Sequence, residues 1–188
     1  CNAVMAALVA GLRRHGMEPA YFWPVGPDWR PHSKTLADIP VDAVVVNGEG
    51  SIHNSAARLR SRFLPEISKF ARDILGVPSF LVNCTLENID SETLAHIASF
   101  DRIFVRETGS LRYLESLGIP ADVVPDLSLV SMAFEGPSPA RDGLAVTDSV
   151  HPGVSERLRA FSEGCGVLRS RVPPRPPLVR IPAGVRRR

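Results

Sequence analysis

Four short runs of apolar and β-branched residues alternate with segments of helical periodicity between residues 43 and 124, and this alternation limits the fold more than any other feature. The strand-like runs cover residues 43–46, 80–83, 103–106 and 121–124. The helical stripes cover residues 2–15, 56–75, 91–99 and 108–117. Strands that alternate with helices through short connections build a parallel sheet with helices against its faces. The sequence therefore predicts the α/β class, with a Rossmann-like parallel sheet and flanking helices.

The first of these runs leads directly into a glycine turn. Gly48 and Gly50 bracket Glu49, and Ser51 stands where a helix N-cap is expected. A strand, a glycine turn and a helix start in this order present backbone N–H groups at the carboxyl edge of a sheet, where open α/β sheets bind ligands. The pattern fits neither the dinucleotide nor the phosphate-loop fingerprint. It is compatible with a ligand site and equally with a turn that only reverses the chain.

Shorter signals set the other boundaries. Asp90 suits a helix N-cap, and Gly76 and Gly118 suit the ends of helices. Residues 19–23 are aromatic and predict a short strand, whereas residues 25–40 lack periodicity and predict a surface loop. Apolar residues at helical spacing are expected to face inward: Leu59, Phe63, Ile67, Phe70 and Ile74 in one helix, Leu94 and Ile97 in the next, and Leu111, Leu114 and Leu117 in the last.

The composition changes after residue 130, which predicts a division into domains. Residues 1–130 form the Rossmann-like N-terminal domain. Residues 131–142 contain Gly, Pro and Ser and predict a linker. Residues 143–166 resume the strand and helix patterns, as the start of a truncated second α/β domain. Residues 167–188 are rich in Arg and Pro without apolar periodicity, so we expect a disordered tail.

Both ends of the chain carry an expectation of their own. The first residue, Cys1, opens directly into a helical stripe, so we expect the start to be internal, with an initial strand and loop missing. The tail has two interpretations. It is a basic, proline-rich arm for an acidic partner, or it is the product of a frameshift in a GC-rich gene, which we favour because the body already uses Arg far more than Lys.

The charge balance argues against a nucleic-acid-binding protein. The whole chain holds 22 basic and 20 acidic residues, a formal charge of +2. Residues 169–188 supply seven arginines and no acid, so residues 1–168 hold 15 basic and 20 acidic residues and a formal charge of about −5. A mildly acidic body does not form the basic surface that binds nucleic acid.

The cysteines and the hydropathy of the chain indicate the cellular compartment and the kinds of site to expect. Cys1, Cys84 and Cys165 are odd in number and lie far apart, so neither a disulfide framework nor a structural zinc site is indicated. No His, Cys, Asp or Glu group has metal-ligand spacing, and no apolar run reaches the length of a membrane span. We expect a protein without a metal or a membrane span in a reducing, cytoplasmic compartment. The oligomeric state is left open.

Polar residues follow each of the four predicted strands. They are Asn47, Gly48, Glu49, Gly50, Ser51 and His53 after the first, Asn83 with Cys84 and Thr85 after the second, Arg106, Glu107 and Ser110 after the third, and Asp126 after the fourth. The carboxyl ends of parallel strands meet at one edge of the sheet, so we expect these residues to line one crevice.

Arg106 and Glu49 are the candidates for chemistry. Arg106 closes an apolar strand, and its guanidinium can grip a carboxylate or a phosphate in bidentate fashion. It can equally form a structural ion pair with Glu107 or with Asp126. Glu49 can serve as a general acid or base, or it can simply be solvated between its two glycines.

Three further residues have a functional and a structural interpretation. His53 can exchange protons near neutral pH, although a lone His near a helix start is more often exposed. Ser110 suits a hydrogen-bonding role at a helix start better than a nucleophilic one, since no His and acid are placed to form a triad. Cys84 is expected to be a small buried apolar residue.

Three segments resemble the polysaccharide pyruvyl transferase family. They are VVNGEGSIH at residues 45–53, VRETGSLRYLESLGI at residues 105–119 and VVPDL at residues 123–127. The order and spacing of the segments match the family as well as the residues do. The similarity covers about residues 2–129, with a weaker continuation over residues 144–161.

The resemblance implies a fold similar to the N-terminal half of a two-domain glycosyltransferase of the GT-B type. It also implies transfer of a pyruvyl group from phosphoenolpyruvate, the donor substrate, to a pair of sugar hydroxyls as a ketal, in the synthesis of a cell-surface polysaccharide or exopolysaccharide. No further cofactor is implied; the partners are the donor and a sugar or polysaccharide acceptor. In such proteins much of the acceptor side lies in the N-terminal half and the donor-gripping residues largely in the C-terminal half, so we expect this chain alone to be inactive.

Two alternatives stay open from the sequence. One is a nucleotide-sugar glycosyltransferase domain of the same GT-B architecture. The other is a non-catalytic glycan-binding module that kept the sheet and lost the chemistry.

Overall fold

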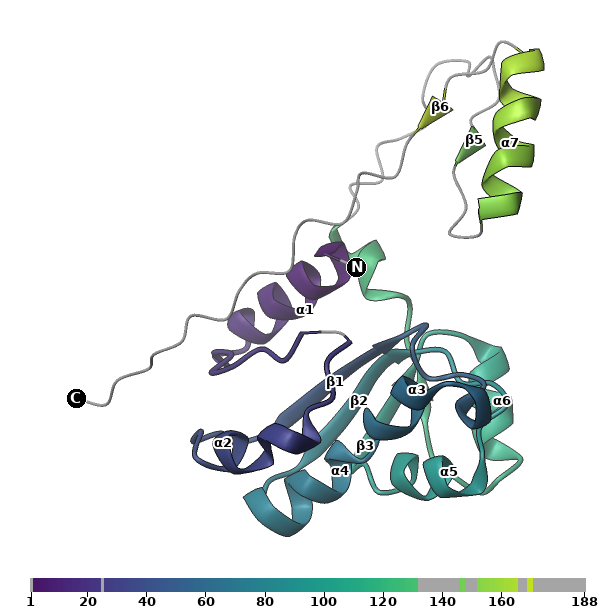
Figure 1. Cartoon of the computed structure of the whole chain (residues 1–188). Coiled ribbons are helices and arrows are strands. Elements are labelled where there is room, and N and C mark those ends of the chain that lie inside the picture. Colours follow the sequence, from purple (N-terminus) through teal and green to yellow (C-terminus); the bar gives the residue numbers. More distant parts are fainter. Residues whose placement is uncertain (1, 25, 132–145, 148–151, 166–168, 171–188) are drawn as a thin grey trace. The chain divides into compact units, whose positions relative to one another are not determined.

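The computed structural model describes residues 2–24, 26–131, 146–147, 152–165 and 169–170. The chain forms two compact units, residues 1–133 and residues 134–188. The first unit carries a four-stranded sheet surrounded by helices, and the second carries two short strands and a helix (Figure 1). The candidate site belongs to the first unit.

The sheet of the first unit is parallel throughout. Its strands stand side by side in the order β1 (Val44–Glu49), β2 (Ser79–Cys84), β3 (Arg102–Val105) and β4 (Asp122–Val123). Val46 lies opposite Leu81, and Leu81 lies opposite Ile103. The predicted α/β class and the parallel sheet are confirmed, and each of the four predicted strand segments contains a strand.

The core of this unit joins strands to helices. Leu81 and Val105 from the sheet are fully buried together with Ile97 and Leu114 from two helices and Ile52 from the loop after β1. Burying side chains of this size stabilises a fold by about 1.5–3 kcal/mol each. Residues from the apolar runs and residues from the helical stripes of the sequence therefore pack together in one core.

The helices of the first unit follow the sequence signals closely in most places. They are α1 (Asn2–Arg14), α2 (Ser33–Ala37), α3 (Leu59–Phe63), α4 (Ile67–Phe70), α5 (Ser91–Ile97) and α6 (Thr108–Glu115), with the 3-10 turns η1 (Arg30–His32), η2 (Ser55–Ala57) and η4 (Leu127–Ser131) and the π-helical turn η3 (Ala71–Leu75). As predicted, the carboxylate of Asp90 caps α5 by accepting a hydrogen bond from the amide of Thr93 at 2.9 Å. Gly76 and Gly118 have φ angles of 67° and 70° just beyond helices, where the left-handed conformation favours Gly.

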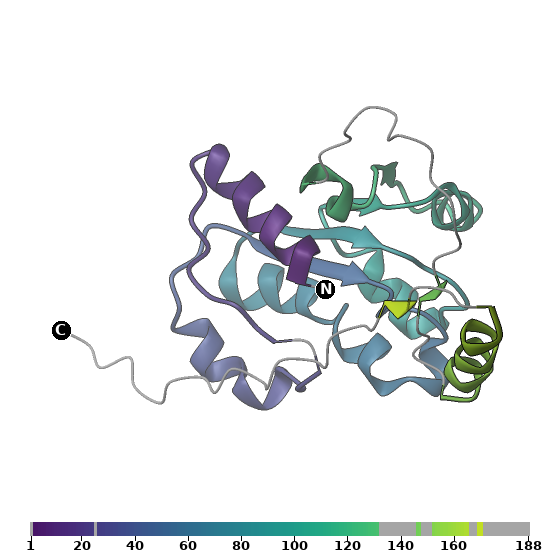
Figure 2. The ribbon, with the colours of Figure 1, turned by 90° about the horizontal axis from the view of Figure 1, so that it is seen from above.

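Contacts between elements fix the layers around the sheet. α1 packs against η4, and α4 packs against α5. Figure 1 shows α4 and α5 beside each other in front of the strands. Figure 2 shows the first turn of α1 close to the carboxyl end of β1, where Met5 of α1 contacts Asn47.

The single long helix predicted over residues 56–75 is wrong. The segment is divided into η2, α3, α4 and η3, and Pro65 lies in the turn between α3 and α4. Pro has no N–H and its ring clashes with the preceding turn, so an α-helix cannot run through it unbroken. The predicted inward face is kept only in its middle: Phe63 and Phe70 are buried, whereas Leu59 and Ile74 are 65% and 63% exposed.

Two predictions for residues 19–40 are also wrong. Residues 19–23 contain no strand, and residues 25–40 are more than a surface loop because they include η1 and α2. Trp29 is buried against Phe63 and Phe70, and its indole N–H donates to the carbonyl of Phe63 at 2.7 Å. An isolated aromatic residue among prolines gives no periodic pattern, so its burial was not predictable from spacing.

The second unit contains β5 (Val146–Thr147), α7 (Pro152–Cys165) and β6 (Arg169–Ser170), and its two strands are parallel. The strand and helix expected in residues 143–166 are thus present. The linker predicted at residues 131–142 lies outside the described residues except for Ser131, and so does the tail predicted at residues 167–188 except for β6. Among the residues that the structure describes, no helix combines the length and the apolar character needed to cross a membrane.

Candidate functional site

The carboxyl ends of the four strands meet in one place, as predicted. The amide of Thr85 donates to the carbonyl of Glu49 at 2.8 Å, and the amide of Arg106 donates to the carbonyl of Cys84 at 3.1 Å. The amide of Val124 then donates to the carbonyl of Val105 at 2.8 Å. These bonds continue the sheet past its last paired residues, so the loops that leave the strands start from a common edge.

Arg106 is held from two directions at this edge. Its Nε donates to the hydroxyl of Thr85 at 2.8 Å, and its Nη1 donates to Oδ2 of Asp126 at 3.0 Å. The Nη2 atom faces the glycine turn, since a Cβ on Gly50 would lie 3.9 Å from it. Within the described part of the chain, no hydrogen bond of this nitrogen is found. The guanidinium is therefore fixed in place with one edge left for another acceptor.

Asp126 rather than Glu107 is the ionic partner of Arg106. Partial burial alone would raise the pKa of Asp126, but hydrogen bonds from Ser128 and from Arg106 lower it below the usual value. Both side chains are partly exposed, at 30% for Arg106 and 27% for Asp126. The predicted ion pair of Arg106 is thus confirmed with Asp126 as the partner. In the same geometry the Nη2 atom of Arg106 is directed to the glycine turn.

The glycine turn differs from the prediction. β1 continues through Gly48 to Glu49, and no helix starts at Ser51, whose amide instead closes a turn on the carbonyl of Gly48 at 2.9 Å. The predicted helix N-cap at Ser51 is wrong because the next α-helix begins only at Leu59. An anion at this edge would therefore meet the guanidinium of Arg106, since no helix N-terminus lies directly after the turn.

Asn47 and Glu49 lie at the α1 side of the turn. The amide of Asn47 donates to Oε1 of Glu49 at 3.1 Å and lies 3.2 Å from the sulfur of Met5. The carbonyl oxygen of the Asn47 side chain is buried and has no hydrogen-bond partner in the described structure. Glu49 has a φ of 40°, a region that non-glycine residues rarely occupy. Its carboxylate is held by a neighbour, so it is more than a solvated group.

Asn83 connects β2 to the loop that carries Asp126. It is completely buried, with a φ of 55°, and its Oδ1 accepts a hydrogen bond from the amide of Leu127 at 3.0 Å. Leu127 directly follows Asp126, so Asn83 sets the position of the carboxylate that pairs with Arg106.

The buried Ser110 and the exposed Glu107 form a separate hydrogen-bonded pair at the start of α6. The hydroxyl of Ser110 donates to Glu107 at 2.7 Å and accepts from the amide of Leu86 at 2.8 Å. Ser110 is 1% exposed, which favours the helix-start role that the sequence suggested. Burial raises the pKa of the Cys84 thiol to about 12, so this thiol stays protonated and is not a nucleophile at neutral pH.

His53 lies in the loop between β1 and α3. Its ring contacts the guanidinium of Arg58, and its Nδ1 lies 2.9 Å from the side-chain amide of Asn54. Its backbone pairs with Glu87 as an isolated bridge. These contacts tie His53 to neighbouring loops, and none of them joins it to Arg106.

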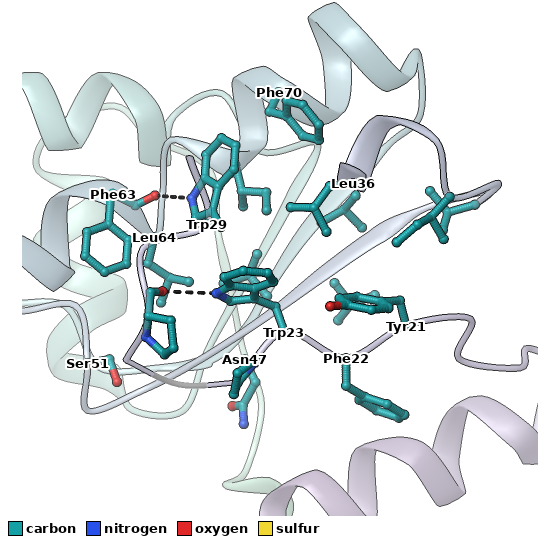
Figure 3. Close-up of a pocket in the computed structure, with 18 of the residues that line it drawn as sticks. Tyr21, Phe22, Trp23, Trp29, Leu36, Asn47, Ser51, Phe63, Leu64 and Phe70 are labelled. Carbon is teal, nitrogen blue, oxygen red and sulfur yellow. Dashed lines mark hydrogen bonds between the residues drawn. The ribbon is translucent and has the colours of Figure 1, made fainter. Parts of the chain in front are cut away.

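Two features of this region were not predicted from the sequence. The first is the role of Thr85 in holding Arg106, which only the register of β2 and β3 reveals. The second is a cavity of about 250 Å³ beside β1, lined by Trp23, Trp29 and Phe63 and reaching Asn47 (Figure 3). The aromatic residues between positions 21 and 29 were the one available signal for it. Across the described residues, no group of three His, Cys, Asp or Glu side chains suits a metal ion.

Comparison with known families agrees with the resemblance seen in the sequence. A family model described as polysaccharide pyruvyl transferase matches residues 2–164 of the 188. The matched range contains every strand end of the candidate site. Searches among curated proteins and among solved structures found no match.

Proposed function

Because this chain belongs to the polysaccharide pyruvyl transferase family, we propose that it serves the transfer of a pyruvyl group from phosphoenolpyruvate to two hydroxyls of a sugar. The product is a cyclic ketal on a cell-surface polysaccharide or exopolysaccharide. The donor carries its own leaving group, so the reaction calls for no separate cofactor. We place it in the cytoplasm, where phosphoenolpyruvate is made.

The chemistry defines what a site must supply. A general acid protonates the methylene carbon of the donor, and a first sugar hydroxyl adds to the resulting oxocarbenium-like carbon and gives up its proton. The bond to the phosphate oxygen then breaks, and the second hydroxyl closes the ketal while its proton is lost to the medium or to phosphate. The step requires a cation for the carboxylate or phosphate and a group that exchanges protons.

The guanidinium of Arg106 is the observation that carries the proposal. Thr85 and Asp126 hold it at the junction of the strand ends, and its Nη2 is directed to the turn at Gly50. A guanidinium fixed in this way binds carboxylate or phosphate oxygens without first losing side-chain freedom. Arg106 therefore suits the anionic end of the donor or an acidic group of the acceptor.

Glu49 is the proposed proton-exchanging group. Its side chain belongs to the last residue of β1 and accepts a hydrogen bond from Asn47, and the exposed Gly50 follows it in the chain. Asn83 and Asp126 act by positioning Arg106. Gly48, His53, Glu107 and Ser110 have contacts that support the surrounding backbone and are proposed to shape the site from behind it.

Thermal-shift titration of the full chain with phosphoenolpyruvate tests the proposal. A ligand that binds only the folded state raises the melting temperature. We expect an increase for the natural chain, its loss in Arg106→Gln, and its retention in Arg102→Gln, an exposed residue at the other end of the same strand. The Arg106→Gln variant also loses the ion pair with Asp126, which can itself lower stability. Its melting temperature without ligand measures that loss, so the ligand-induced increase can be compared separately.

The same titration distinguishes the alternatives. Stabilisation by nucleotide-sugars but not by phosphoenolpyruvate would point to a glycosyltransferase domain. Stabilisation by neutral glycans alone would point to a binding module. Either result would contradict the assignment of phosphoenolpyruvate as the donor.

A further inference from the structure

The loop that follows β1 has its carbonyl groups engaged by α3. The hydroxyl of the buried Ser61 lies within hydrogen-bond distance of the carbonyls of Ser51 and His53, at 2.8 and 3.0 Å. The guanidinium of Arg62 donates to the carbonyl of Ser55 at 3.0 Å. Because these acceptors are occupied by side chains of the helix, this loop offers mainly side-chain donors to a ligand.

Two such donors face each other at the ring of His53. The side-chain oxygen of Asn54 accepts a hydrogen bond from Asn88 at 2.8 Å, so its amide nitrogen is the atom that lies 2.9 Å from Nδ1 of His53 and donates to it. A neutral imidazole that accepts at Nδ1 carries its proton on Nε2. The Nε2 atom contacts Nη1 of Arg58, and a guanidinium can only donate. An acceptor bound beside this pair would satisfy both donors.

No carboxylate of the described residues neutralises this pair. Neither His53 nor Arg58 forms an ion pair there, whereas the nearby Arg62 has Asp90 at 3.8 Å. Glu87 pairs with His53 through the backbone alone, and its exposed side chain makes no ion pair with either residue. Arg58 is exposed and His53 is partly exposed, so a ligand can reach both.

The pair belongs to the same edge of the sheet as Arg106. Glu87, whose backbone is bridged to His53, stands two residues after Thr85, whose hydroxyl accepts a hydrogen bond from Arg106. Two residues of chain span at most about 7 Å. A donor molecule at Arg106 and a second ligand at His53 and Arg58 can therefore lie next to each other.

We propose that the ring of His53 and the guanidinium of Arg58 bind an oxyanion of the acceptor, the carboxylate or the phosphate of an acidic sugar. The oxyanion accepts from Nε2–H of His53 and from N–H groups of Arg58, and such charge-assisted bonds are stronger than bonds between neutral groups. The hydrogen bonds of Ser61 and Asn54 fix the loop in advance, so little freedom is lost on binding. The assignment of the anion to the acceptor rests on the proposed function, whereas the anion site itself does not.

Nuclear magnetic resonance of the His53 ring tests the site in the full chain, and the spectrum of His53→Gln identifies its signal among the five histidines. Glucuronate supplies a sugar carboxylate, glucose 1-phosphate a sugar phosphate, inorganic phosphate the anion alone, and glucose the neutral control. At constant pH, we expect a saturable shift of the ring nitrogen signals with glucuronate or glucose 1-phosphate and none with glucose. The acidic sugar that binds more tightly identifies the anion that the acceptor carries.

Three variants separate a specific site from a general attraction to positive charge. Arg58→Gln should weaken binding of the acidic sugar about fivefold or more, because the charged donor is removed. Arg60→Gln is the matched control: it makes the same change at an exposed residue of α3 whose Cζ lies 3.6 Å from a Cβ on Gly26, and it should bind like the natural chain. Glu87→Gln should bind at least as tightly as the natural chain, since it removes a competing negative charge.

Equal weakening in Arg58→Gln and Arg60→Gln would overturn the proposal. So would a shift with glucose as large as that with the acidic sugars, inorganic phosphate that binds as tightly as either sugar, or the absence of a saturable shift with every probe. The donor is tested separately: Arg106→Gln should abolish the stabilisation by phosphoenolpyruvate and keep the acidic-sugar signal at His53. Failure of the donor assignment is thus distinguishable from failure of the anion site.

Discussion

Gly48 and Gly50 bracket one turn, but only Gly48 is required by packing. A Cβ on Gly48 would lie 2.5 Å from the Cβ of Cys84, whereas a Cβ on Gly50 would come no closer than 3.9 Å to Arg106. Neither glycine has a positive φ, and the strained residue of the turn is Glu49. Gly48 therefore lets β1 and β2 approach each other at the edge where the site lies.

Gly48→Ala should destabilise the protein by roughly 1–3 kcal/mol, because the new methyl group must displace the backbone of β2 near Cys84. Urea denaturation measures the effect as a lower midpoint. Gly11→Ala is the matched control: a Cβ there meets nothing within 4 Å, and Ala favours a helix interior over Gly by about 0.5–1 kcal/mol. A Gly48→Ala variant with the natural midpoint would show that the two strands can separate without cost.

At the same scale, the sequence identified the important side chains but not all of their partners. Arg106 and Asp126 were predicted to share the sheet edge, and they do, because the carboxyl ends of parallel strands must meet. Thr85 was expected at this edge, but its hydrogen bond to Arg106 was not predicted, since the hydroxyl reaches the guanidinium only through the register of two strands. The positive φ of Glu49 and Asn83 was equally hidden, because side-chain type alone does not fix backbone conformation there.

At the scale of helices and strands, the sequence predicted where helices occur but not whether a helical segment is continuous. The apolar spacing of residues 56–75 is helical, yet Pro65 divides the segment and a π-helical turn completes it. The helical spacing of apolar residues is kept across the break, because Phe63 of α3 and Phe70 of α4 still pack with Trp29 in one cluster. The proline was the overlooked signal, and it carries more weight than the apolar spacing around it.

The start of α5 gives stability a defined dependence on pH. Hydrogen bonds from the hydroxyl of Ser55 and the amide of Thr93 to its carboxylate lower the pKa of Asp90 from 3.8 to about 2. A carboxylate with a lowered pKa stabilises the folded state above the pKa of the unfolded chain, and this contribution is lost as the pH falls from about 4 to about 2. Its size is on the order of 2 kcal/mol at most.

Asp90→Asn should therefore lower the urea midpoint at neutral pH, and the difference from the natural chain should shrink steadily below about pH 4. Asn is itself a good N-cap, so α5 is expected to form in the variant. Asp122→Asn makes the same charge change at an exposed residue and should alter neither the midpoint nor its pH dependence. A constant difference between Asp90→Asn and the natural chain down to about pH 2.5 would exclude this role for Asp90.

For the molecule as a whole, topology was the most predictable property. Alternation of strand and helix leaves few arrangements, and the observed order β1-β2-β3-β4 follows the chain order. The cavity beside β1 was not predictable. Its shape depends on how side chains such as Trp29 and Phe63 pack, whereas sequence patterns predict only the positions of helices and strands. The proposed chemistry comes from membership of the family, because the fold alone does not specify a reaction.

The two compact units lead to a last prediction, on truncation after residue 133. The core residues of the first unit, from Val4 to Leu114, all lie within residues 1–133, so this segment should fold without the rest. We expect cooperative urea unfolding with a free energy within about 0.5 kcal/mol of the full chain. Residues 1–133 hold 12 basic and 15 acidic residues, so retention on a cation-exchange column should also disappear. A truncated chain that binds apolar dye and unfolds without cooperativity would mean that residues 134–188 complete the fold, and the candidate site would then have to be sought in the full chain alone.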